Sequence, residues 1–178
     1  MFIEGDVDLS TQAEVDSFVG SSIAGNLLIH GSDIVDLKPL SVLDSVDGYL
    51  RVGINGLNGG NASLTNLDGL SNITSVGGLT IWTNDVLTSL DGLSNITSFG
   101  GHLHVAFNAS LTNLDGLSNL ISVGGRLVIK HNASLNNFCG LYSLLSSNGL
   151  QGSFDVSSNL INPTQQQIID DGPCMPAA

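Results

Sequence analysis

Residues 111–129 read LTNLDGLSNLISVGGRLVI, and two closely similar stretches precede them: LTNLDGLSNITSVGGLTI at 64–81 and LTSLDGLSNITSFGGHLHV at 87–105. The first residues of the three copies are 23 and 24 residues apart. A fourth copy begins at Leu135 and then diverges, and degenerate copies precede the first one at 34–52 and 25–29. Repetition at such a period is typical of folds in which each repeat buries its apolar edge against the next.

Apolar positions align down the repeats and indicate strands rather than helices. Within each copy they are two or three residues apart, which is the period of a strand interrupted by corners and not the roughly 3.6-residue period of a helix. We therefore predict a mainly β fold: a right-handed parallel β-solenoid with turns of about 24 residues and short helical caps at both ends. The aligned positions include Leu67, Leu90, Leu114 and Phe138; Leu79, Leu103 and Leu127; and Ile81, Val105 and Ile129.

The chain of 178 residues is expected to form a single domain. Its sequence character divides it into an N-terminal strand and cap helix (1–24), repeat turns (25–138) and a C-terminal cap (139–178). Thr11 and Glu14 have the spacing of a capping box, which predicts a helix over 12–19. Near the other end, Asn162 is predicted to cap a helix over 163–170 that begins with a proline.

Glycine and asparagine mark the predicted corners of each repeat. Pairs of glycines at 77–78, 100–101 and 124–125 precede the Leu-x-Ile type strands, and we expect positive φ angles there. Two asparagine columns are expected to stack and to satisfy backbone groups that the bends leave unpaired. They are Asn84, Asn108 and Asn132, and Asn72, Asn95 and Asn119. Five asparagines also lie in Asn-x-Ser/Thr sequons, for which a corner role and glycan attachment are alternatives: Asn61, Asn72, Asn95, Asn108 and Asn132.

Charge and cysteine content narrow the class of protein. With 16 acidic and 4 basic residues, the formal net charge is −12, which argues against binding to nucleic acid or to anionic membranes. No apolar run approaches the roughly 18 residues of a membrane span, so we expect no membrane insertion. Cys139 and Cys174 predict a disulfide and an oxidising compartment, with two buried free thiols as the alternative. We expect a secreted or cell-surface protein whose signal peptide has been removed.

The repeat and the opening of the chain resemble a known family. The pattern Ser-Val-Gly-Gly-x-Leu-x-Ile, followed by x-x-Asn-x-x-Leu-x-x-Leu-x-Gly-Leu-x-Asn-Leu, is similar to the receptor L domain, a leucine-rich-repeat-like module. Residues 5–15 resemble the cap that begins bacterial versions of it. In that family the module forms ligand-binding lobes of receptor ectodomains and parts of bacterial surface and fungal cell-wall proteins. The resemblance therefore implies a recognition or adhesion role, without the cysteine-rich modules of receptor kinases.

One outward surface, along the Leu-x-Ile strands, carries the candidate ligand-binding residues. Trp82 is the only tryptophan, Phe107 lies one strand away, and an insert at 53–60 adjoins them. Exposed aromatic side chains on a flat sheet suit contact with a protein or a sugar, although Trp82 packed beneath the insert is the alternative. His102 and His104 flank an inward leucine and are interpreted as exposed rather than metal-bound, because no third ligand is in reach. The candidates are Thr80, Trp82, His102, His104, Phe107, Ile54 and Leu57.

A second outward surface carries short hydroxyl columns. Its residues are Ser63, Thr65, Thr88, Ser110, Thr112 and Ser134. Flat Ser/Thr arrays on β-solenoids suit ice binding, because the ~4.8 Å strand spacing approximates an ice repeat. Val86 and Asn136 interrupt the array. Ice binding is thus an alternative function, and a structural spacer or self-associating unit is a second alternative.

The sequence contains no nucleophile elbow, phosphate-binding loop, dinucleotide fingerprint or zinc-ligand motif. Asp68, Asp91 and Asp115 recur once per repeat, which favours a turn role over a catalytic pair and over calcium binding. We expect a protein that is not an enzyme, without cofactor or metal, whose partner is an extracellular protein or carbohydrate.

Overall fold

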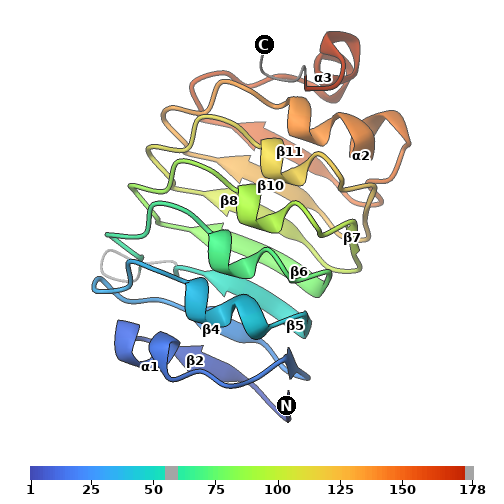
Figure 1. The fold of residues 1–178 in the computed structure, drawn as a ribbon. Coiled ribbons are helices and arrows are strands. Elements are labelled where there is room, and N and C mark those ends of the chain that lie inside the picture. Colours follow the sequence, from blue (N-terminus) through green and yellow to red (C-terminus); the bar gives the residue numbers. More distant parts are fainter. Residues whose placement is uncertain (55–59, 175–178) are drawn as a thin grey trace.

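The computed structural model describes residues 1–54 and 60–174, and these form a mainly parallel β-sheet with a few short helices (Figure 1). A nine-stranded sheet has the order β1-β3-β5-β6-β8-β10-β11, with β2 pairing β4 and β4 also pairing β5. Strands β7 (Ser98–Phe99) and β9 (Ser122–Val123) form a separate pair. The main-sheet strands are β1 (Phe2–Ile3), β2 (Val7–Leu9), β3 (Ser22–Ile23), β4 (Leu27–Ile29), β5 (Ser45–Val52), β6 (Ser75–Trp82), β8 (Leu103–Ala106), β10 (Leu127–Lys130) and β11 (Phe154–Ser157).

The strands pair in the register that the repeats predict. Leu79 lies beside Leu50 and Leu103, and Ile81 lies beside Val52 and Val105. Equivalent residues of successive repeats are therefore neighbours across the sheet. The sheet is not closed, and it ends at β1 and β2 on one side and at β11 on the other.

Short helices form a second row that runs across the repeats, with the apolar core between this row and the sheet (Figure 1). The aligned leucines, isoleucines and valines are almost completely buried. The Asp-Gly dipeptides, predicted as turns, begin 3₁₀ helices. The helices are α1 (Gln12–Asp16), η1 (Lys38–Val42), η2 (Asp68–Leu70), η3 (Asp91–Leu93), η4 (Asp115–Leu117), η5 (Cys139–Leu141), α2 (Tyr142–Ser146) and α3 (Gln165–Asp171).

The glycine pairs serve close approach rather than an unusual backbone. None of the six has a positive φ, so that prediction was wrong. A Cβ atom at Gly77 would instead clash with the backbone carbonyl of Asp47, and one at Gly124 would clash with that of Gly100. At five of the six positions an added Cβ atom would come within 3.0 Å of an atom of another repeat, and only Gly100 has open space there.

The column of Asn84, Asn108 and Asn132 forms a buried hydrogen-bonded ladder. Asn84 Nδ2 donates to Asn108 Oδ1, and Asn108 Nδ2 donates to Asn132 Oδ1, both at 3.1 Å. Asn84 Nδ2 also donates to the Val52 carbonyl at 3.0 Å, and Asn108 Nδ2 donates to the Ile81 carbonyl at 3.1 Å. Asn72, Asn95 and Asn119 are exposed, and each donates to a carbonyl of the preceding repeat. Both predicted corner roles are confirmed.

The end caps differ from their predictions in extent. The capping box of Thr11 and Glu14 is present, but α1 ends at Asp16 and Val19 is 70% exposed. At the C-terminal end, Thr164 rather than Asn162 caps α3. Asn162 accepts hydrogen bonds from the Asn159 backbone and side chain at 2.9 and 3.2 Å. Asn132 Nδ2 in turn donates to Asn159 Oδ1 at 2.9 Å, so Asn162 is the last member of the asparagine ladder. It is therefore not available as a helix cap.

The predicted disulfide is present and joins η5 to the segment after α3. Cys139 and Cys174 have Cα atoms 4.9 Å apart and enclose a sequence separation of 35 residues. The bond thereby ties the last helix to the row of 3₁₀ helices. Within the described ranges, no helix has the length and apolar character needed to cross a membrane.

Candidate ligand-binding surface

Six ring-bearing side chains follow one another across the outward face of strands β5, β6, β8 and β10 and the turns next to them. We call Tyr49, His102, His104, Trp82, Phe107 and His131, in that order, the ring row. Successive ring centroids are 6.5, 5.9, 6.4, 5.7 and 4.6 Å apart. This near-continuous row is the most distinctive outward feature of the sheet.

Glycines provide the room in which two of these rings lie. A Cβ atom at Gly78 would clash with the Tyr49 ring, and one at Gly101 would approach the Tyr49 hydroxyl to 2.8 Å. A Cβ atom at Gly125 would clash with the His102 ring. Each ring therefore extends over the neighbouring strand instead of pointing into solvent.

The backbone at one end of the row is held in a left-handed conformation. Thr83, Phe107 and His131 occupy the same repeat position and have φ angles of 56°, 58° and 55°. Such angles cost residues other than glycine roughly 1–2 kcal/mol each. The Phe107 side chain is nonetheless 42% exposed. Ser158 has a φ of 60° at the equivalent position, so the conformation belongs to the corner of each repeat and only the side chain differs.

Arg126 fixes the orientation of the two central histidines. Its backbone N–H donates to His102 Nδ1 at 3.0 Å, and its side-chain Nε–H donates to His104 Nε2 at 3.1 Å. Since both accepting nitrogens must be unprotonated, the neutral rings carry their hydrogen on His102 Nε2 and His104 Nδ1. Burial lowers the pKa of His104, and the charge of Arg126 and the neighbouring His102 lower it further. Both rings thus offer one N–H donor to a ligand.

The structure brings together most of the predicted candidates. Trp82 is half-buried and stacks on Phe107 with an interplanar angle of 20°. Thr80 lies beside His104 in the adjacent strand. Ile54 is half-buried at the edge of the insert, and Leu57 lies outside the described residues.

Four further residues of this surface were not predicted as site residues: Tyr49, Arg51, Arg126 and His131. The Arg51 guanidinium lies over the Tyr49 ring, 5.5 Å from its centroid. Two signals in the sequence could have found the rings. Tyr49 lies in β5 and pairs with Gly78 of the neighbouring strand, and His131 occupies the repeat position of Phe107.

The hydroxyl columns are largely exposed but lie on irregular backbone. Thr65, Thr88 and Thr112 are exposed, and none of them belongs to a strand. The Thr88 hydroxyl donates to the Thr65 carbonyl at 3.2 Å. The flat strand face that the ice-binding alternative assumes is therefore not formed at these residues.

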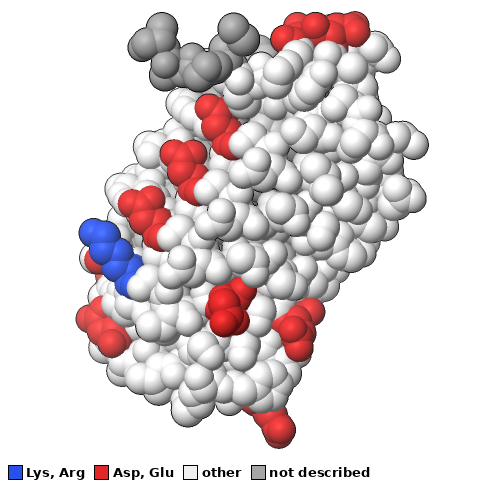
Figure 2. Space-filling model, turned by 45° about the vertical axis from the view of Figure 1, so that its right-hand side comes forward, with Lys and Arg blue, Asp and Glu red and all other residues white. Residues whose placement is uncertain are grey.

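The 3₁₀ row carries carboxylates, and acidic side chains dominate the charged atoms of the side shown in Figure 2. Asp115 Oδ1 lies 3.3 and 3.2 Å from the Cys139 and Cys174 sulfurs. These sulfurs are joined in the disulfide and carry no proton, so this group cannot ligate a metal as a pair of thiolates. Burial and the neighbouring Asp91 raise the pKa of Asp115.

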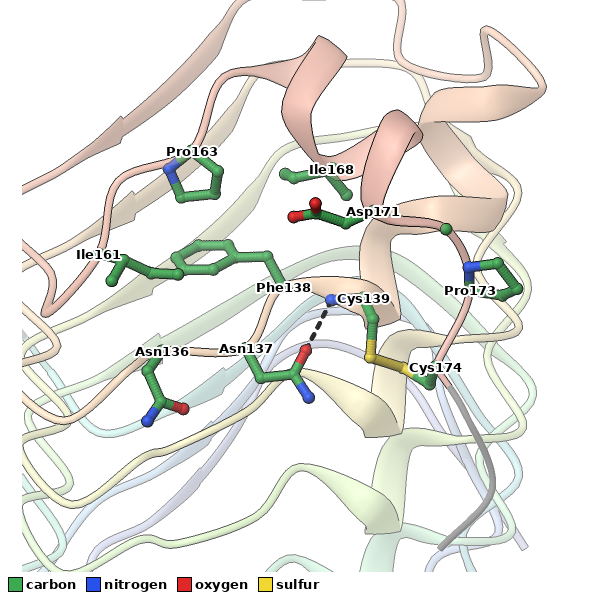
Figure 3. Close-up of a pocket in the computed structure, with 11 residues that line it drawn as sticks. Asn136, Asn137, Phe138, Cys139, Ile161, Pro163, Ile168, Asp171, Pro173 and Cys174 are labelled. Carbon is green, nitrogen blue, oxygen red and sulfur yellow. Dashed lines mark hydrogen bonds between the residues drawn. A yellow bond between two sulfur atoms is a disulfide. The ribbon is translucent and has the colours of Figure 1, made fainter.

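A hollow of about 360 Å³ lies at the C-terminal cap, away from the ring row. Figure 3 shows Phe138, Ile161, Pro163 and Ile168 around it, with the disulfide at one side. The Asn137 side chain accepts a hydrogen bond from the Cys139 backbone at 3.0 Å. Asn136, Asn137 and Asp171 also line the hollow, so its surface is both polar and apolar.

Comparisons with models of protein families and with curated proteins find no match to this sequence.

Proposed function

We propose that this protein is a non-catalytic recognition or adhesion module that binds an extracellular ligand through the ring row. The observation that supports this most is the exposure of two stacked rings, Phe107 and His131, on the outward side of the sheet. Thr83 and Ser158 have the same left-handed backbone at this corner position, so the corner itself does not require an aromatic ring.

The proposal includes the architecture and the setting. The register between repeats and the row of short helices favour a right-handed parallel β-solenoid of the receptor L-domain type. Removal of residues 111–134, a stretch of one repeat, would then leave a shorter protein that still unfolds cooperatively. The disulfide favours an oxidising compartment and so a secreted or cell-surface protein.

The test of function is a binding panel with a matched pair of variants. Wild type, Trp82→Ala and Ile121→Ala are presented to purified neutral and acidic polysaccharides and to purified extracellular proteins. Ile121 is a large apolar side chain with 56% exposure outside the ring row. A ligand of this surface should bind wild type and Ile121→Ala equally and bind Trp82→Ala at least roughly tenfold more weakly. Equal binding by Trp82→Ala would refute the ring row as the site.

Ice binding remains an alternative because Thr65, Thr88 and Thr112 form an exposed column with one threonine per repeat. A thermal-hysteresis measurement with wild type and Thr88→Leu decides it. Activity in wild type that Thr88→Leu loses would support this alternative, and its absence in wild type would end it. Light scattering over a range of concentrations tests the spacer or self-association alternative.

A further inference from the structure

The cationic side chains of this acidic protein are concentrated around the ring row. Of the four Lys and Arg residues, Arg51 lies in β5, Lys130 in β10, and Arg126 directly before β10. The paired segments 49–54, 78–83, 102–107 and 126–131 contain these three residues and three of the four histidines, and they contain no Asp or Glu. Lys130 is paired with Asp155 of β11, so in this chain with a net charge of −12 the positive charge of the ring row comes from Arg51 and Arg126.

The two arginines lack acidic partners. The ion pairs in the described ranges 1–54 and 60–174 are Lys130 with Asp155 and His30 with Asp8. Neither guanidinium has a carboxylate oxygen of the described residues within 4.0 Å. Arg126 retains its terminal N–H groups for a ligand after donating Nε–H to His104.

The hydrogen-bond donors of the ring row favour an anion. His102 and His104 each accept one hydrogen bond from Arg126 and keep their other ring nitrogen as an N–H donor. Imidazole N–H groups and guanidinium groups both bind anions.

The two arginines lie on different strands of the sheet. Arg51 is in β5 and Arg126 directly precedes β10, so their backbones are three strand steps or about 14 Å apart. A polymer with recurring carboxylates can place one carboxylate on each arginine.

We infer that the ring row binds a uronic-acid polysaccharide, with Arg51 and Arg126 on separate carboxylates and His102 Nε2–H, His104 Nδ1–H and the hydroxyls of Tyr49 and Thr80 on sugar oxygens. This inference rests on the proposed function and names its ligand class. The imidazole N–H and hydroxyl groups beside the arginines suit the many hydroxyl oxygens of a sugar chain, which an acidic polypeptide lacks.

The experiment is affinity electrophoresis of the full chain in gels that contain one of three probes: polygalacturonate, its methyl ester, or poly-L-glutamate. The methyl ester keeps the sugar chain and removes the charge, and poly-L-glutamate keeps the charge and removes the sugar. Variants are Arg51→Gln and Arg126→Gln, with Lys38→Gln as a matched control that removes one positive charge at the 3₁₀ row. Circular dichroism shows that each variant is folded.

Polygalacturonate should retard wild type and Lys38→Gln alike, and each arginine variant should bind it about tenfold more weakly, the loss of one hydrogen-bonded charge pair. The methyl ester and poly-L-glutamate should retard wild type far less. The inference would be overturned if polygalacturonate does not retard wild type. It would also be overturned if the methyl ester or poly-L-glutamate retards wild type equally, or if Lys38→Gln weakens binding as much as the arginine variants do. If the ring row then binds another panel ligand in a Trp82-dependent manner, the proposed function stands without this ligand class. If no ligand depends on Trp82, both fail.

Discussion

The asparagine ladder and the ring row lie side by side, since each ladder residue directly follows a residue with left-handed backbone. Asn84, Asn108 and Asn132 have the same environment in every repeat and are fully buried. The residues before them are Thr83, Phe107 and His131, which share a backbone conformation but no side-chain chemistry. The uniform column holds the repeats together, and the varied column is free to carry specificity. Substitutions in the two columns should therefore affect different measurements.

The largest effect is expected from the ladder. Asn108→Leu would leave the buried Asn84 backbone N–H without its partner and would remove the hydrogen bonds that Asn108 Nδ2 donates to the Ile81 carbonyl and to Asn132 Oδ1. We expect the free energy of unfolding to fall by about 3–5 kcal/mol, because each unsatisfied buried group costs roughly 1–3 kcal/mol. Urea unfolding followed by circular dichroism measures it.

Asn95→Leu is the matched control, because Asn95 is exposed and makes one carbonyl contact at 2.6 Å. Its loss of unfolding free energy should be within about 1 kcal/mol, because water replaces the Asn95 amide as the partner of the carbonyl. Similar losses of unfolding free energy in Asn108→Leu and Asn95→Leu would show that burial of the ladder does not increase its contribution to stability.

Removal of the disulfide should have the next largest effect. Cys139→Ser with Cys174→Ser opens a loop with a sequence separation of 35 residues, for which chain entropy predicts a loss of about 3–4 kcal/mol. Differential urea unfolding of the oxidised wild type and the double variant measures this loss. An unchanged midpoint would mean that the C-terminal cap is held by its packing alone.

Phe107→Gly should separate the two columns most clearly. Glycine removes the strain at a φ of 58°, so the free energy of unfolding should be unchanged or rise by up to about 1 kcal/mol. Ligand binding should fall, because the rings of Trp82 and His131 lose the partner between them. A stability loss comparable with Asn108→Leu would identify Phe107 as a packing residue.

The smallest effect concerns pH. The pKa of His104 is lowered in the folded state, chiefly by burial, so the unfolded chain binds the proton more readily. This contribution to stability is present above the unfolded pKa of about 6.5 and is lost as pH falls through it toward the folded value. His104→Gln should flatten the stability profile in that window, measured by urea unfolding at a series of pH values. A profile identical to that of wild type would contradict the shift.

The sequence was sufficient for the repeat register and for the asparagine columns. Aligned apolar residues and one asparagine per repeat permit few other arrangements, because a shift by one residue would expose the core. The positions of the corner glycines were predicted correctly, but the reason that glycine is required there was not. A positive φ and a close approach between strands both require glycine, and a single sequence does not distinguish them.

The candidate surface was predicted in part. Trp82 and His104 follow from strand alternation. Phe107 was predicted just past the outward column, and its exposure comes with the left-handed backbone after β8. The contribution of Arg126 does not, because it depends on side-chain conformation across the strands. The helix start at Thr164 was missed because Asn162, an equally good capping residue, is used by the ladder.

The most direct test of the ring row as the ligand-binding surface uses Trp82, the only tryptophan of the chain. Polygalacturonate, and any other ligand from the binding panel, is titrated into the folded protein while the tryptophan emission is recorded. We predict a saturable change in emission whose midpoint matches the affinity from electrophoresis. In Phe107→Gly the same titration should give a weaker affinity. A ligand that saturates the protein and leaves the emission of Trp82 unchanged would contradict it.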